Sequence, residues 1–138
     1  MLEKIKKLLP HKLFKALQPI YHYVIAFLAA LVYRFPSRKM IVIGVTGTAG
    51  KTSTVYLISK TLSAAGYKTG FTSTAVFSDG DREVLNDKKM TMPGRFFIQR
   101  SLHRMTKNGC RYAIVETTSE GIKQFRHRFI NYDVLVFT

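Results

Sequence analysis

The fold of this chain is decided by Met40-Ile-Val-Ile-Gly-Val-Thr-Gly-Thr-Ala-Gly-Lys-Thr-Ser53. A β-branched run, typical of a buried strand, leads into a glycine-rich turn. From Lys51 onward, apolar residues recur at helical spacing. A strand, a glycine-rich turn and a helix in this order aim consecutive backbone N–H groups at one point, and the helix N-terminus adds a partial positive charge. The stretch therefore predicts a phosphate-binding loop.

The residue types in the loop suggest which groups bind a nucleotide. Lys51 is expected to reach the β- and γ-phosphates of ATP, and the Thr52 hydroxyl to bind Mg²⁺. The strict phosphate-loop pattern requires glycine where Val45 stands; the glycines fall at 44, 47 and 50 instead. A tight turn with a chance Lys-Thr pair is the alternative, and the strand and helix on either side argue against it. The expected nucleotide contacts are Gly47, Thr48, Ala49, Gly50, Lys51, Thr52 and Ser53.

Strand and helix patterns alternate through residues 40–138. The expected elements are strands over 40–45, 68–74, 112–116 and 133–137, and helices over 51–65 and about 93–108. The polar stretch up to Lys89 is expected to form a loop or hairpin. This alternation predicts an α/β phosphate-loop fold with a parallel sheet and right-handed crossovers.

Ligands of such sheets bind beyond the carboxyl ends of the strands. The glycine loop, Thr72–Thr74 and Glu116 all fall on that edge. Because an unpaired carboxylate at the end of a buried strand costs free energy, we expect Glu116 to bind Mg²⁺ beside the phosphates. The alternative is a helix-capping or ion-paired acid that faces solvent.

Residues 1–39 differ in character from residues 40–138, and the boundary lies near Phe35–Lys39. The chain has 138 residues and a net charge of +14, and the first 39 hold eight Lys or Arg and one acid. Such a balance suits an anionic partner, which can be phosphates, nucleic acid or a membrane surface. The single cysteine, Cys110, excludes an internal disulfide framework and fits a reducing compartment.

The N-terminal segment contains an uncharged apolar run from Ala16 to Tyr33. Pro19 weakens a membrane-spanning interpretation, since a helix counted from Ile20 covers only ~21 Å of a ~30 Å hydrocarbon core. Basic residues flank both ends, which favours a helix lying on an anionic leaflet. A spanning helix and a helix packed on the domain remain the alternatives. We therefore expect a cytoplasmic protein at the inner face of the membrane.

The loop Gly44-Val-Thr-Gly-Thr-Ala-Gly-Lys-Thr-Ser53 resembles the ATP-binding loop of the Mur ligases, which commonly reads G-x-T-G-T-x-G-K-T/S. Met90-Thr-Met-Pro93 is similar to the Thr-Thr-Pro segment of the branch that adds diaminopimelate or lysine. The stretch from Glu116 to Arg126, with Tyr132–Thr138, resembles that branch's E-V-S-S-H-x-L-x-Q-x-R segment and the strand after it. The resemblance covers about residues 40–138 and implies the central ATP-binding domain.

By this resemblance, the reaction is amide formation in peptidoglycan precursor synthesis. ATP phosphorylates a carboxylate of a UDP-MurNAc-peptide-like acceptor, and an amino acid attacks the acyl phosphate. A lipid-linked acceptor is a separate hypothesis, which would account for a membrane location of the N-terminal segment. Lys51 and Glu116 are then the implied catalytic residues, with Thr52 and Glu116 as Mg²⁺ ligands. The residues implied to hold the acceptor are Thr91, Thr118, Gln124 and Arg126.

The sequence departs from the family pattern at several positions. Met92 replaces a threonine, Thr118 a serine and Glu120 a histidine. Residues 1–39 are too short and too apolar for the usual uridine-binding domain, and the family's later motifs and C-terminal domain do not follow. We therefore expect a piece of a longer ligase that binds ATP weakly and catalyses nothing by itself.

Two other functions remain open from the residues alone. One is a phosphate-loop ATPase or nucleotide switch whose basic surface, with Arg95, Arg100, Arg104 and Lys107 on one helix, binds nucleic acid. The other is a non-catalytic binding module held at a membrane. The same basic helix face is commonly just solvated.

Overall fold

A six-stranded sheet forms the centre of the protein, as seen in a computed structural model that describes residues 10–138. The strands are β1 (Ile41–Thr46), β2 (Thr69–Thr72), β3 (Val76–Ser78), β4 (Glu83–Leu85), β5 (Tyr112–Glu116) and β6 (Val134–Phe137). They lie in the order β4-β3-β2-β5-β1-β6. The strands β2, β5, β1 and β6 are parallel, which confirms the predicted α/β class, whereas β3 and β4 pair antiparallel at one edge.

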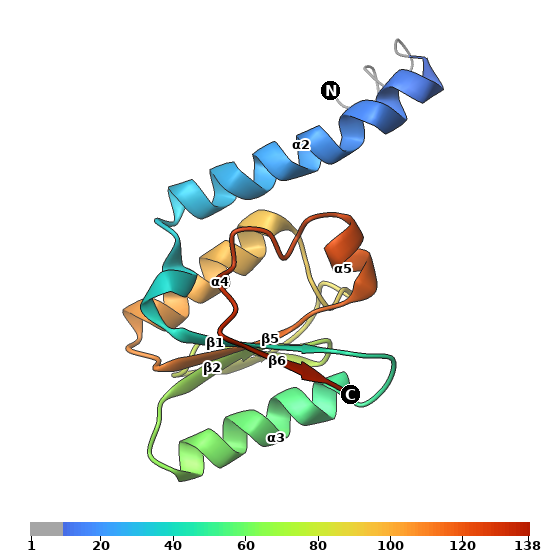
Figure 1. The fold of residues 1–138 in the computed structure, drawn as a ribbon. Helices are drawn as coiled ribbons and strands as arrows, with labels where there is room; N and C mark the ends of the chain where they lie inside the picture. The colour runs from blue at the N-terminus through green and yellow to red at the C-terminus, as the bar shows by residue number, and fades with distance from the viewer. Residues whose placement is uncertain (1–9) are drawn as a thin grey trace.

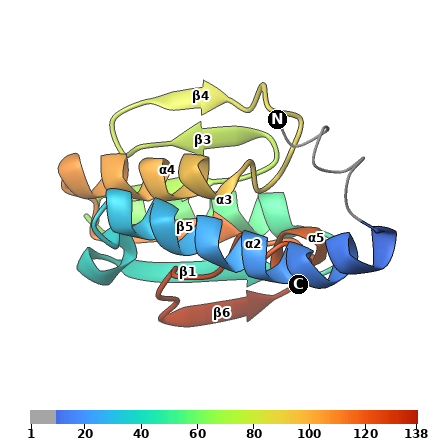
Figure 2. The ribbon, with the colours of Figure 1, turned by 90° about the horizontal axis from the view of Figure 1, so that it is seen from above.

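Helices cover both faces of this sheet (Figure 1). They are α2 (His11–Val32), α3 (Lys51–Ala64), α4 (Arg95–Lys107) and α5 (Ser119–Lys123), with a short 3₁₀ helix η1 (Pro36–Lys39). On one face, Val55 of α3 packs against Phe71 and Ile114 of the sheet. On the other face, α4 buries Leu102 and its neighbours against the sheet, and α2 crosses the outer side of α4 (Figure 2).

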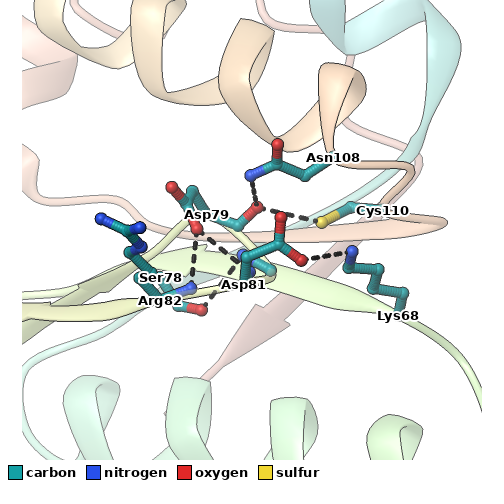
Figure 3. Close-up of polar contacts among 8 residues, drawn as sticks. Lys68, Ser78, Asp79, Asp81, Arg82, Asn108 and Cys110 are labelled. Atoms are coloured by element: carbon teal, nitrogen blue, oxygen red, sulfur yellow. Dashed lines mark hydrogen bonds and ion pairs between the residues drawn. The ribbon is translucent and has the colours of Figure 1, made fainter.

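The segment between β2 and α4 forms a hairpin, one of the two forms expected for it. At its turn, the Asp79 carboxylate accepts hydrogen bonds from the backbone N–H groups of Asp81 and Arg82 at 3.0 and 2.9 Å. The Asp79 carbonyl accepts from Asn108 at 3.0 Å and from the Cys110 thiol at 3.5 Å (Figure 3). Burial raises the pKa of Cys110 to about 11, so this cysteine is a packing residue and a poor nucleophile.

The structure differs from the expected elements at one boundary and by one additional helix. The helix α4 begins at Arg95 instead of Pro93, because Gly94 takes a backbone conformation with φ of 4° and ψ of 155° before the first helical turn. The short helix α5, not foreseen as an element, follows β5 directly and is capped by the Thr118 hydroxyl, which accepts from the Gly121 N–H at 3.0 Å. Both changes bring backbone near the carboxyl edge of the sheet.

The N-terminal helix α2 continues through Pro19, so the count from Ile20 was too short. Its 22 residues cover ~33 Å at 1.5 Å per residue. By length and composition, with a mean hydropathy of 1.3, it is long and apolar enough to cross a membrane. It packs on the domain through small side chains, since Ala26, Ala29 and Ala30 are buried.

Candidate functional site

The glycine loop joins the end of β1 to the start of α3, as the sequence predicts. Gly47 and Gly50 have φ values of +137° and +79°, which favour glycine. A Cβ at position 47 would lie 2.3 Å from the Thr138 carbonyl oxygen. Thr138 also donates its hydroxyl to the Ala49 carbonyl at 2.6 Å, so the residue after β6 holds the loop in place.

Lys51 opens α3 and folds back over the loop. Its ammonium donates to the Gly47 carbonyl at 2.8 Å. Within residues 10–138 it forms no salt bridge with a carboxylate. A cation held at the mouth of the loop without an acidic partner is suited to a phosphate oxygen.

Glu116 ends β5 beside the loop and is buried, with 1% of its surface exposed. Its carboxylate accepts from the Thr52 hydroxyl at 3.0 and 3.2 Å. It also accepts from the backbone N–H and the hydroxyl of Thr74 at 2.8 and 3.0 Å. All of these donors are neutral, and no cation among residues 10–138 forms a salt bridge with Glu116. The solvent-facing alternative for this residue is therefore wrong.

The donor set at Glu116 fits Mg²⁺. Within the described residues no three His, Cys, Asp or Glu side chains group to hold a metal, so a closed all-protein cage is absent from this part of the chain. Mg²⁺ is commonly held by one or two protein oxygens, with waters and phosphate oxygens completing its octahedron. The Glu116 carboxylate and the Thr52 hydroxyl are such oxygens, and the buried negative charge gives them a reason to bind a cation.

A cavity of about 290 Å³ lies over these groups. It is lined by six of the seven expected nucleotide contacts, all except Gly47, and by two of the four expected acceptor contacts, Thr91 and Thr118. The Thr91 hydroxyl shares a 2.7 Å hydrogen bond with that of Thr74, which ties the Met90–Pro93 segment to the Glu116 cluster. A smaller cavity of about 210 Å³ along the β3–β4 hairpin and a larger one of about 420 Å³ beside α3 are predominantly apolar. The groups expected to bind phosphate line the predominantly polar cavity of about 290 Å³.

The other two expected acceptor residues lie apart from this cavity, beyond α5. Arg126 donates to the Gln124 side chain at 2.6 Å and to the Met92 carbonyl. Arg95 donates to the Gln124 carbonyl and contacts His22 Nδ1 of α2 at 2.6 Å. The alternative that Arg95 lies on a solvated helix face is therefore wrong. Both guanidinium groups keep a buried Nε without a hydrogen-bond partner.

We call this second group the arginine cluster; it consists of His22, Arg95, Gln124 and Arg126. Burial and neighbouring charge shift the pKa values of its three titratable members. Burial, then the charges of Arg95 and Arg126, lower the pKa of His22. Burial, followed by the charge of Arg126, lowers the pKa of Arg95. Two partly buried cations without a salt bridge in residues 10–138 form an electropositive spot suited to a carboxylate or phosphate.

The sequence placed Thr74 on the ligand edge, within Thr72–Thr74, but it assigned no contact to Thr74 or to Thr138. Thr74 supplies two of the donors to Glu116, and Thr138 holds the glycine loop. A polar residue just after each of β2 and β6 was the available signal, because both strands end on the ligand edge.

Comparisons with known proteins agree with the geometry. The family model described as the Mur ligase middle domain matches residues 45–138. A UDP-N-acetylmuramyl-tripeptide synthetase of Roseiflexus sp. (strain RS-1) is 40% identical over 116 residues, 83% of this chain and 23% of that protein. The protein of the same name from Borreliella afzelii (strain PKo) is 44% identical over 109 residues, 77% of this chain and 22% of that protein.

A solved structure of UDP-N-acetylmuramoyl-L-alanyl-D-glutamate–2,6-diaminopimelate ligase shares the fold. Its TM-score is 0.65 at 24% identity, over 79% of this chain and 23% of that chain. The chain therefore spans less than a quarter of the length of these relatives.

Proposed function

Because this chain belongs to the Mur ligase family through its middle domain, we propose that it is the ATP-binding part of an ATP-dependent carbon–nitrogen ligase of peptidoglycan precursor synthesis. The substrates proposed are ATP, an amino acid and a UDP-MurNAc-peptide-like acceptor. The names of its relatives, which are tripeptide synthetases, support this substrate class. The family membership disfavours the alternative of a nucleic-acid-binding ATPase.

One observation carries this proposal: a buried carboxylate, Glu116, lies directly against a glycine loop and has only neutral donors among residues 10–138. A purely structural acid in that position would be expected to have a cationic partner, because an uncompensated buried charge is costly. A magnesium-bound triphosphate provides both the cation for Glu116 and the anion for Lys51.

The reaction proposed has two steps. A carboxylate oxygen of the acceptor attacks the γ-phosphorus of ATP, the bond to the bridging oxygen breaks, and ADP leaves. The amine of the amino acid then attacks the acyl carbon, and inorganic phosphate leaves as the amide forms. The amine loses a proton in this step.

In this scheme the residues of this chain act by position and charge. The loop amides and Lys51 hold the β- and γ-phosphates and stabilise the negative charge that spreads over the transferring group. Thr52 and Glu116 hold Mg²⁺, which supplies further charge neutralisation at the phosphate oxygens. Glu116 in turn keeps its position through Thr74.

Acceptor binding is assigned to Thr91, Thr118, Gln124 and Arg126. Thr91 and Thr118 line the cavity, where their hydroxyls meet the reacting end of the acceptor. Gln124 and Arg126 belong to the arginine cluster, whose unpaired cations suit an anionic group further along the same substrate. Arg95 is added to this set because its guanidinium lies in the same cluster.

The proposed location is the cytoplasm, where ATP is available. The finer location at the inner face of the membrane, with a lipid-linked acceptor, requires a segment that contacts lipid. Within residues 10–138, α2 is the helix with the length and composition for that contact.

The test is ADP release by the gene product that contains this chain, with UDP-MurNAc peptides and single amino acids supplied in turn. We expect release that requires both acceptor and amino acid. Hydrolysis that ignores both and rises with nucleic acid would replace the ligase with the ATPase. ATP binding without phosphate release under all conditions would favour a non-catalytic module.

A further inference from the structure

The outward face of α2 carries a continuous row of large apolar side chains. They recur at spacings of three and four residues, which places them on one side of a helix. Each is between 42 and 61% exposed: Leu13, Leu17, Ile20, Tyr21, Val24, Leu28 and Leu31. We call this row the aliphatic stripe. Contiguous exposed apolar surface of this kind marks an interaction site in a soluble domain.

The opposite face of α2 is the one that packs on the domain, and its fully buried residues are small, although Tyr23 and Phe27 beside them contact Phe129. Ala26, Ala29 and Ala30 are at most 2% exposed. An ordinary surface helix has the reverse arrangement, with its large apolar residues toward the core and its polar residues toward water. The large apolar side chains of α2 therefore face away from the domain, which indicates that a second apolar environment covers them.

The charged residues around α2 indicate which apolar environment covers the stripe. Lys12 and Lys15 stand near one end of α2, and Arg34, Arg38 and Lys39 follow the other end. The sequence has no Asp or Glu from residue 4 to residue 78. A basic, acid-free segment around an apolar row matches the surface of an anionic lipid leaflet, where each nearby cation adds to the attraction.

We propose that the aliphatic stripe of α2 docks this domain onto an anionic membrane surface, with the helix lying in the plane of the headgroups. This inference does not rest on the proposed ligase activity.

Packing and charge argue against two other environments for the aliphatic stripe, the interior of a bilayer and a second copy of the chain. A spanning helix would have to leave α4, exposing the buried alanines and breaking the ring contacts of Tyr23 and Phe27 with Phe129. A second copy of the chain would bring two surfaces of the same positive sign together. Docking by the stripe needs neither change.

The orientation leaves the phosphate loop accessible. The sheet separates α2 and α4 on one side from α3 on the other (Figure 1). A membrane against the outer face of α2 would therefore be remote from α3. A single reporter on each helix can distinguish the two faces.

The 138 residues contain no tryptophan, so one introduced tryptophan reports its own surroundings. Leu28→Trp places it in the stripe, and Leu57→Trp, at a site 64% exposed on α3, is the matched control. Vesicles of phosphatidylglycerol and phosphatidylcholine are added to each variant. We expect a blue shift and acrylamide protection for position 28 only, and quenching by brominated lipids at a shallow depth, ~5–10 Å into the boundary.

Other results would overturn the proposal. No shift at position 28 means no docking, and strongest quenching at the bilayer centre means a spanning helix. An equal shift at position 57 means unfolding on the lipid. A shift without vesicles that grows with protein concentration means a second copy.

A second variant keeps the test independent of tryptophan. The double change Leu17→Gln with Leu28→Gln should weaken flotation on the same vesicles by at least about tenfold, because two buried leucines are lost from the lipid contact. Leu57→Gln should float like the unchanged chain. Equal flotation of the double variant and the unchanged chain would contradict docking by the stripe.

Discussion

The carboxylates at the two ends of the parallel strands have different kinds of partner. At the amino end, around Asp79, every acid has a structural partner: backbone N–H groups bind Asp79, and Lys68 forms a salt bridge with Asp81 (Figure 3). At the carboxyl end, Glu116 is far more buried, yet within the described part of the chain only hydroxyls and one N–H donate hydrogen bonds to it. The acids at the amino end have their partners within the described chain, whereas we propose that a cation is the further partner of Glu116 at the carboxyl end.

This difference separates structural acids from functional ones. Although burial raises the pKa of Asp79, the backbone N–H groups of Arg82 and Asp81 outweigh it, and the pKa lies below its usual value. That carboxylate is stabilised by the turn it closes. The Glu116 carboxylate is far more buried than that of Asp79 and forms no salt bridge among residues 10–138, which is the physical reason to propose a cation as its ligand.

The largest effect on ATP binding is expected from removing the charge of Glu116 at the carboxyl end. Glu116→Gln keeps the shape but removes the anion that holds Mg²⁺, so Mg²⁺ should no longer strengthen ATP binding. We expect at least a tenfold loss, roughly the contribution of one charged hydrogen-bonding partner, measured by calorimetry with and without Mg²⁺. Asp79→Asn is the control and should leave ATP binding unchanged. An intact magnesium effect in Glu116→Gln would rule out the metal role.

The next effect compares one glycine at each end. Gly47 and Gly80 both have positive φ, and a Cβ on either would meet an atom at 2.3 Å, the Thr138 carbonyl oxygen or the Cys110 sulfur. Each change to alanine should lower the free energy of unfolding by ~1–3 kcal/mol, measured by urea denaturation. Only Gly47→Ala should also reduce ATP affinity. Equal ATP affinities in the two variants would show that the loop geometry is not needed.

A smaller effect concerns the thiol at the amino end. With its pKa raised to about 11, Cys110 is about one part in a thousand thiolate at pH 8. Iodoacetamide should therefore leave the folded chain unmodified by mass spectrometry and modify it fully in urea. The rate should rise as the pH approaches the raised pKa. Rapid modification of the folded chain at pH 8 would mean that this end is open.

The smallest effect is expected from the salt bridge between Lys68 and Asp81. Both side chains are about half exposed, so water already solvates them and the pair adds little. Lys68→Met should unfold at an unchanged urea concentration and bind ATP as before. A clear fall in the urea midpoint would contradict this prediction, because it would mean that the Lys68–Asp81 salt bridge contributes substantially to stability.

The sequence predicted the elements whose residues repeat. The helix expected over about residues 93–108 and the apolar strand ending at Glu116 rest on local patterns, and α4 and β5 confirm both. Such patterns depend only on which side of an element faces the core. The position of Glu116 on the ligand edge followed from a second general rule, that ligands bind beyond the carboxyl ends of parallel strands.

Contacts between distant segments were not predictable in this way. Thr138 reaches the loop from the end of the neighbouring strand β6, and Arg95 turns toward His22 because α2 packs on α4. The inward alanines of α2 were equally hidden, since apolar residues on all sides of a helix give no sign of which face packs. The register of separate elements decides these contacts, and local spacing does not encode it.

The phosphate-binding role of the loop is tested most directly by the Mg-ATP affinity of Lys51→Ala, with Lys60→Ala on the same helix as the control. Lys51 stands at the loop, whereas Lys60 is exposed and pairs with Glu83. We expect affinity to fall roughly 10- to 100-fold in Lys51→Ala only. Undiminished affinity in Lys51→Ala, or an equal fall in both variants, would contradict a triphosphate held in this loop.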